Sequence, residues 1–135
     1  MIEEIISEEI IYAIIIRSNY SFDGIKFFTN NDSPQQIGYM KRPKDYKILP
    51  HIHYKKPRVI DMTHEVLFIK SGKVRINFYK QNKDYLTSRE LFTGDTILLA
   101  AGGHGVTMIE ESEIIEVKQG PYLEDSDKER FEPYE

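Results

Sequence analysis

The distribution of apolar residues constrains the fold most strongly. Apolar residues occur in short segments that are rich in Ile, Val, Tyr and Phe. These segments are separated by clusters of Gly, Pro, Asn and Asp, and little of the chain follows the 3.6-residue period of a helix. This pattern predicts an all-β protein, because many short strands at close spacing favour a sandwich or a barrel. The predicted strands are Ile10–Arg17, Ile25–Thr29, Gln36–Met40, Tyr46–His53, His64–Lys70, Lys73–Tyr79, Arg89–Phe92, Thr96–Ala100, Val106–Glu110 and Glu113–Lys118.

The length of 135 residues suits one domain, and a composition of 40% hydrophobic and 30% charged residues is typical of a folded chain. We therefore expect a single domain over residues 1–135, with its core at about 47–118, N-terminal strands in 1–46 and an acidic tail in 119–135 that could lie over the core. The two-residue link Ser71-Gly72 predicts a hairpin, so the strands on either side of it are expected to be neighbours.

Composition also excludes several kinds of site and partner. The chain has no Cys, so any metal must be held by imidazole and carboxylate groups. The longest apolar run, Ile10–Ile16, is much shorter than a membrane span and follows four glutamates, where a signal peptide would be basic. We therefore expect a cytoplasmic protein with no membrane partner. The net charge of −4 argues weakly against a nucleic-acid partner. The apolar run Ile10–Ile16 could pair with its copy in a homodimer.

Three of the four histidines lie at predicted strand ends or turns. His51 and His53 are two residues apart, so on a strand both imidazoles would lie on one face in a chelating arrangement. His104 follows two glycines, which deliver its side chain with little crowding, and it could close the same site. These residues predict a metal site.

Glu65 is the carboxylate nearest to this pattern. It shares a strand face with Leu67 and Ile69, and an acid on an otherwise apolar face needs a partner. A metal ion would be such a partner, and an ion pair with Arg58 or Arg75 is the alternative.

The stretches His51-Ile52-His53, Glu65 to Gly72 and Gly94-Asp95 to His104 together resemble the two sequence motifs of the cupin superfamily. The resemblance covers about residues 47–118 and implies an antiparallel jelly-roll β-barrel that often dimerises. It also implies a divalent transition metal, such as iron, manganese, zinc or nickel, bound by His51, His53, His104 and Glu65. Two features depart from typical cupins: the gap between His53 and Glu65 is longer, and Ala100 stands where a proline is usual.

The segment Val117–Tyr122, followed by Asp127-Lys128, is similar to small cupins associated with polysaccharide and nucleotide-sugar biosynthesis. A basic stretch between Lys41 and Arg58 fits an anionic small-molecule ligand. Lys47, Arg58 and Arg75 are the ligand-binding candidates, and the stretch could equally be a solubilising surface.

Three functions follow from these expectations. The first is a metal-dependent cupin that acts on a small polar or anionic metabolite such as a sugar or sugar nucleotide. It could be an isomerase, an epimerase or an oxygenase, with His64 or Tyr54 as general acid or base. The second is a metal-free barrel resembling nucleotide-sugar keto-isomerases, in which His51 and His53 act as acid and base. The third is a non-enzymatic module that binds a small ligand, because one fold can host either role.

Overall fold

The computed structural model describes residues 1–124 and 127–134. By its internal contacts the chain divides into two compact units. The larger unit consists of residues 1–20 and 63–135, and the smaller unit of residues 21–62.

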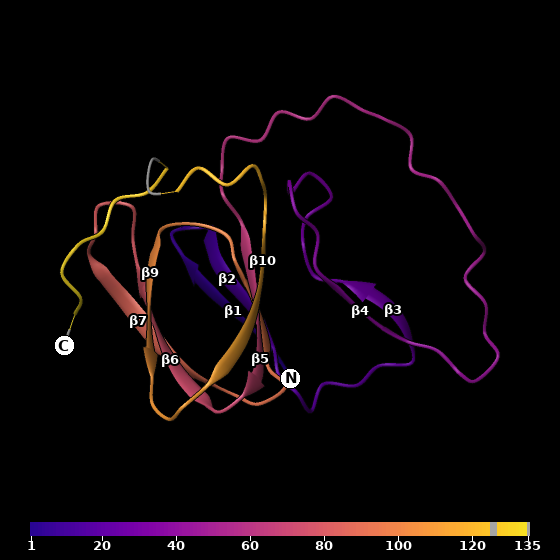
Figure 1. The fold of residues 1–135 in the computed structure, drawn as a ribbon, viewed down its shortest axis with the longest axis horizontal. Coiled ribbons are helices and arrows are strands. Elements are labelled where there is room, and N and C mark those ends of the chain that lie inside the picture. Colours follow the sequence, from indigo (N-terminus) through magenta and orange to yellow (C-terminus); the bar gives the residue numbers. More distant parts are fainter. Residues whose placement is uncertain (125–126, 135) are drawn as a thin grey trace. The chain divides into compact units, whose positions relative to one another are not determined.

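The larger unit contains two antiparallel sheets (Figure 1). The first has the strand order β1-β2-β8-β5-β10 and the second the order β7-β6-β9. The strands of the first sheet are β1 (Ile2–Ser7), β2 (Ile10–Ile16), β8 (Thr96–Leu99), β5 (Glu65–Ser71) and β10 (Glu113–Lys118). Those of the second are β7 (Tyr85–Phe92), β6 (Lys73–Tyr79) and β9 (Gly103–Met108).

The hydrophobic core lies between these two sheets. In β6, Val74, Ile76 and Phe78 are buried, whereas the alternate residues Arg75 and Asn77 are not. Burial of one such apolar side chain stabilises the fold by roughly 1.5–3 kcal/mol. The core draws on both sheets and contains Ile5, Tyr12, Ala13, Ile15, Leu67, Ile69, Val74, Ile76, Phe78, Leu91, Ile97 and Leu99. The unit is therefore a β-sandwich.

The predicted hairpin at Ser71-Gly72 is wrong, because the chain crosses between the sheets at this point. β5 pairs with β8 and β10, whereas β6 pairs with β7 and β9. Gly72 has a φ of 95°, and a Cβ at this position would lie 2.5 Å from the Glu111 carbonyl oxygen and overlap the Ser112 side chain. A glycine is thus required where the chain passes close to the neighbouring loop.

A buried ion-pair network joins β2 to the turn before β8. Asp95 is 2% exposed, and its carboxylate accepts hydrogen bonds from the backbone N–H groups of Ser18 and Phe92, both at 2.8 Å. Arg17 donates to Asp95 at 2.9 Å and to Glu3 at 2.6 Å. The hydrogen bond from Arg17 holds the pKa of Glu3 below its usual value, although burial acts in the opposite direction. This network fixes the Gly94-Asp95 turn.

The smaller unit contains one antiparallel hairpin of β3 (Gly24–Phe27) and β4 (Gly38–Lys41). The predicted strand Tyr46–His53 is wrong, since residues 42–62 form no strand in the described chain. Pro43, Pro50 and Pro57 interrupt this segment, and a proline lacks the N–H group that a sheet requires. Ile52 is 90% exposed, so the segment has no buried face of the kind that strand alternation assumes.

The all-β, antiparallel architecture predicted from the sequence is confirmed, and the described strands form separate sheets instead of one closed barrel. The proposed pairing of Ile10–Ile16 across a dimer is not available, because β1 and β8 occupy both edges of this strand. A homodimer through another surface stays a prediction. In the described residues, no helix has the length and apolar character needed to cross a bilayer.

Candidate functional site

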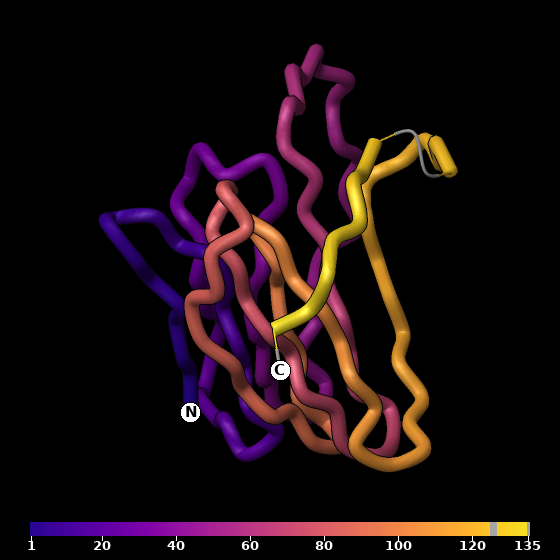
Figure 2. The backbone as a smooth tube through the Cα atoms, turned by 90° about the vertical axis from the view of Figure 1, so that its left-hand side faces the viewer, coloured from indigo at the N-terminus to yellow at the C-terminus, as the bar shows by residue number. Residues whose placement is uncertain are grey.

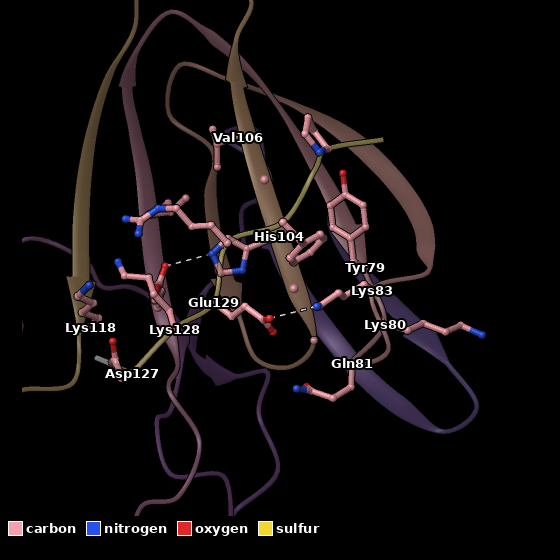
Figure 3. Close-up of a pocket in the computed structure, with 18 of the residues that line it drawn as sticks. Tyr79, Lys80, Gln81, Lys83, His104, Val106, Lys118, Asp127, Lys128 and Glu129 are labelled. Carbon is pink, nitrogen blue, oxygen red and sulfur yellow. Dashed lines mark ion pairs between the residues drawn. The ribbon is translucent and has the colours of Figure 1, made fainter. Parts of the chain in front are cut away.

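A pocket of about 800 Å³ opens at one end of the sandwich in the larger unit (Figure 3). Its walls come from both sheets and from the chain after β10. The residues on which its chemistry depends are Glu65 of β5, Glu116 and Lys118 of β10, Tyr79 of β6, His104 of β9 and Phe131 of the C-terminal segment.

Strand register places Glu65 and His104 on the inner faces of the two sheets. Residues directly opposite in an antiparallel pair share a face. Glu65 lies opposite Leu99 and His104 lies opposite Phe78, and both of these partners belong to the hydrophobic core. The two polar side chains therefore project between the sheets, where the core gives way to the pocket.

The two side chains form the ion pair marked beside His104 in Figure 3. His104 Nε2 lies 3.3 Å from Glu65 Oε2, and the side chains are 29% and 20% exposed. The hydrogen bond from His104 holds the pKa of Glu65 below its usual value, and the charges of His104 and Lys118 and a hydrogen bond with Glu116 act in the same direction. Partial burial opposes this shift. Glu65 is thus ionised at neutral pH.

An ionised Glu65 fixes the tautomer of His104. A carboxylate only accepts hydrogen bonds, so His104 Nε2 carries the proton in this pair. Nδ1 of a neutral His104 is then unprotonated and can accept a proton or a hydrogen bond. The pair is thus suited to acid–base chemistry as it stands, and to metal binding if Nε2 loses its proton.

The residues Asp127–Tyr134, here called the strap, cross one end of the three-stranded sheet (Figure 2). The Phe131 ring contacts the Tyr79 ring edge-on at 5.0 Å between centroids. The Tyr134 ring stacks on Tyr85 at 3.8 Å, and the Tyr134 N–H donates to the Tyr79 hydroxyl at 2.8 Å. The strap thereby covers the edge of the pocket beside β6 and β9.

Gly103 makes room for this contact. A Cβ on Gly103 would lie 3.1 Å from the Phe131 ring, which is tighter than most carbon contacts. The absence of a side chain beside His104 thus lets the aromatic ring of the strap pack directly on β9. Gly103 therefore has a packing role, in addition to the freedom expected from the sequence.

His51 and His53 lie in the smaller unit, and their ring centroids are 5.1 Å apart. His51 Nδ1 lies 2.9 Å from the carbonyl oxygen of Leu49, which can only accept, so Nδ1 carries the proton and Nε2 is left as an acceptor. This tautomer suits a metal ligand. Within either unit taken alone, residues 1–124 and 127–134 contain no group of three or more His, Asp or Glu side chains arranged to hold a metal.

The other predicted site residues are dispersed. Lys47, Tyr54 and Arg58 are exposed in the smaller unit. Arg75 pairs with Glu90 at 3.4 Å, on the side of β6 that faces away from the core, so it is not the partner of Glu65.

His64 is buried instead of lining the pocket. It is 4% exposed, and its backbone N–H donates to the Gln119 side chain at 2.8 Å. Burial lowers the pKa of its imidazole, so His64 is neutral at neutral pH. Its role as a general acid or base stays a prediction.

Comparisons with protein-family models, with curated proteins and with solved structures give no match to this chain. The assignment of the candidate site therefore depends on its geometry alone. The sequence did not identify the strap, Glu116 or Lys118 as part of the pocket. Finding Glu116 and Lys118 would have required the register of β10 against β5.

Proposed function

We propose that the chain is a cupin-like protein that takes a small polar or anionic metabolite, such as a sugar or sugar nucleotide, into the pocket at Glu65 and His104. The observation that carries the proposal is the Glu65–His104 pair, which lines a pocket on the inner faces of the two sheets, beside the apolar core. A polar pair that only stabilised the fold would not need a cavity of this size beside it.

The path of the chain supports the jelly-roll part of the proposal. Consecutive strands pass from one sheet to the other at four connections: β5 to β6, β7 to β8, β8 to β9 and β9 to β10. Repeated crossing of this kind is the property that double-sheet jelly rolls share.

We further propose that a divalent transition metal binds at this pair. The 3.3 Å between His104 Nε2 and Glu65 Oε2 suits two donors that share one ion at about 2.0–2.2 Å from each. The further ligands predicted from the sequence are His51 and His53, and the tautomer of His51 suits that role. When bound, such a metal polarises a carbonyl or hydroxyl group or activates water, and iron would add oxygen chemistry.

The metal-free alternative is favoured by one observation, the ionised Glu65 that already orients His104. A carboxylate–imidazole pair of this kind can move a proton without a metal. In this form of the alternative Glu65 and His104 would carry the acid–base function, whereas the sequence-based version assigned it to His51 and His53. A module that binds its ligand without converting it would use the same pocket.

Elemental analysis of the untagged full chain, kept away from chelators and nickel resin, tests the metal proposal. We expect about one equivalent of a transition metal, or its uptake from added zinc, manganese or iron. Glu65→Gln and His104→Ala are each expected to weaken metal binding at least about tenfold. Removal of a group that only orients a metal ligand already weakens metal binding by about this factor, and a direct ligand should matter at least as much. The same loss is expected for the His51→Ala/His53→Ala double variant.

Glu90→Gln is the matched control, since Glu90 forms partly exposed ion pairs with Lys73 and Arg75 outside the pocket. It should leave metal binding unchanged. Absence of metal from the wild type, with no uptake from added salts, would contradict the metal proposal and favour the metal-free alternative.

A further inference from the structure

The smaller unit buries almost none of its own apolar surface. Among residues 21–62, all of which the structure describes, Ile37 is the only buried residue, at 8% exposed. Burial of one such side chain contributes roughly 1.5–3 kcal/mol, whereas fixing the backbone of each ordered residue costs roughly 1–2 kcal/mol. A two-stranded hairpin is marginally stable unless it packs on another element. The β3–β4 hairpin therefore needs a packing partner.

This hairpin has an apolar face. Ile25 lies directly opposite Met40 in the register of the two strands, so their side chains share a face. Phe27 is two residues after Ile25 on β3 and lies on the same face. Ile25, Met40 and Phe27, here called the hairpin face, are 42%, 45% and 58% exposed. An apolar cluster left in water in this way marks an interaction surface.

A second exposed apolar surface lies on the larger unit, at the edge of the five-stranded sheet formed by β10 (Figure 1). Ile115 lies directly opposite Phe68 in the pairing of β10 with β5. Leu67 and Ile69 belong to the core, so Phe68 between them and Ile115 opposite it point away from the core. Val117 lies on the same side of β10 as Ile115. Phe68, Ile115 and Val117, here called the edge face, are 38%, 52% and 55% exposed.

The two units carry opposite net charges. Residues 21–62 contain eight Lys and Arg and four Asp, which gives a net charge of +4. Residues 1–20 and 63–135 contain the other ten basic and 18 acidic residues of the chain, which gives −8. Two larger units from different copies therefore repel each other, whereas a smaller unit attracts the larger unit of another copy. A second copy thus offers the hairpin face both an apolar surface and the opposite charge.

We propose that the hairpin face of one copy packs on the edge face of a second copy, and that a twofold axis repeats this contact to give a closed homodimer. Because the contact joins two different surfaces, the dimer contains it twice, and the buried area is doubled. The inference goes beyond the proposed function, since neither face lines the pocket. It gives the homodimer predicted from the sequence a surface other than the run Ile10–Ile16.

The test is the dissociation constant of the dimer, measured on the full chain by analytical ultracentrifugation. Phe27→Lys places a charge in the hairpin face, and Ile115→Glu places the opposite charge in the edge face. Ile6→Lys and Ile6→Glu are the matched controls, because Ile6 is 52% exposed on β1, at the other edge of the same sheet. Circular dichroism verifies that each variant is folded.

We expect a dimeric wild type at micromolar concentration. Phe27→Lys and Ile115→Glu should each raise the dissociation constant at least about tenfold, because each places an unpaired charge in both apolar contacts of the dimer. The two Ile6 variants should dimerise like the wild type. Should Phe27→Lys fail to fold, Ile115→Glu still tests the contact, since it changes an exposed residue outside the core.

A mixture of Phe27→Lys and Ile115→Glu shows whether the contact joins two copies. In a mixed dimer, one contact keeps both wild-type faces and the other brings the new lysine to the new glutamate. The mixture should therefore dimerise more tightly than either variant alone, and native mass spectrometry identifies the mixed dimer by its mass. A monomeric wild type, a dimer that tolerates both substitutions, or a mixture that dimerises no better than its components would overturn the inference.

Discussion

Replacement of Asp95 by alanine is expected to lower the free energy of unfolding by about 3–5 kcal/mol, which is typical when one partner of a buried ion pair is removed. Asp95 is 2% exposed and accepts hydrogen bonds from the Ser18 and Phe92 N–H groups and from Arg17. Its loss leaves the Arg17 guanidinium and two backbone donors without this acceptor. Urea denaturation followed by circular dichroism measures the effect.

Two further variants show whether loss of the buried ion-pair network causes this destabilisation. Asp95→Asn keeps an acceptor for the backbone but loses the ion pair, so its effect should lie between those of the wild type and Asp95→Ala. Glu113→Ala removes an exposed carboxylate that lies 3.9 Å from Lys70, and should cost less than about 1 kcal/mol. A similarly small cost for Asp95→Ala would mean that this network does not hold the turn.

Gly102→Ala is expected to destabilise the sandwich by at least about 2 kcal/mol and to displace His104. Gly102 has a φ of +66°, and a Cβ there would overlap the Tyr79 carbonyl oxygen and lie 2.7 Å from the Tyr12 ring. Because Gly102 is two residues before His104, relief of this overlap must move the start of β9. Thermal unfolding and metal uptake should therefore both be affected.

Gly105→Ala is the matched control for this prediction. Gly105 lies in the same strand, and a Cβ at this position would meet nothing within 4 Å. Its replacement should change stability by no more than about 0.5 kcal/mol. Equal stabilities of the two variants would show that the close approach of Gly102 to Tyr79 does not constrain the fold.

Strand positions could be predicted where turn residues bound a β-rich run. The predicted strands Lys73–Tyr79 and Glu113–Lys118 have the bounds of β6 and β10, because each is a β-rich run between turn residues. The strand Ile2–Ser7 was missed. Glu8 and Glu9, which link it to β2, adopt φ values of 51° and 66°, and glutamate rarely marks a turn of that kind.

Tertiary context decided the features that sequence patterns left ambiguous. A short link between two β-rich runs fits a hairpin and also a crossing between sheets, and at Gly72 the chain crosses to the other sheet. The alternation of His51 and His53 suggested a strand, but the prolines on both sides of them prevent sheet pairing.

The candidate site was partly predictable. Glu65 and His104 were identified as partners for one site, and the larger unit brings them within 3.3 Å of each other. The strap residues Arg130 and Phe131 were treated only as part of an acidic tail, and Lys128 was noted only within the resemblance of Asp127-Lys128 to small cupins. Composition describes the average charge of such a segment, but it does not show which of its side chains line the pocket.

Anomalous diffraction from crystals of the full chain grown with zinc tests the central claim most directly, because it locates the ion independently of activity. We predict one strong peak at about 2.0–2.2 Å from both His104 Nε2 and a Glu65 carboxylate oxygen. A map with no peak at either residue, or with zinc bound only elsewhere, would contradict the proposal that this pair is the centre of a metal site.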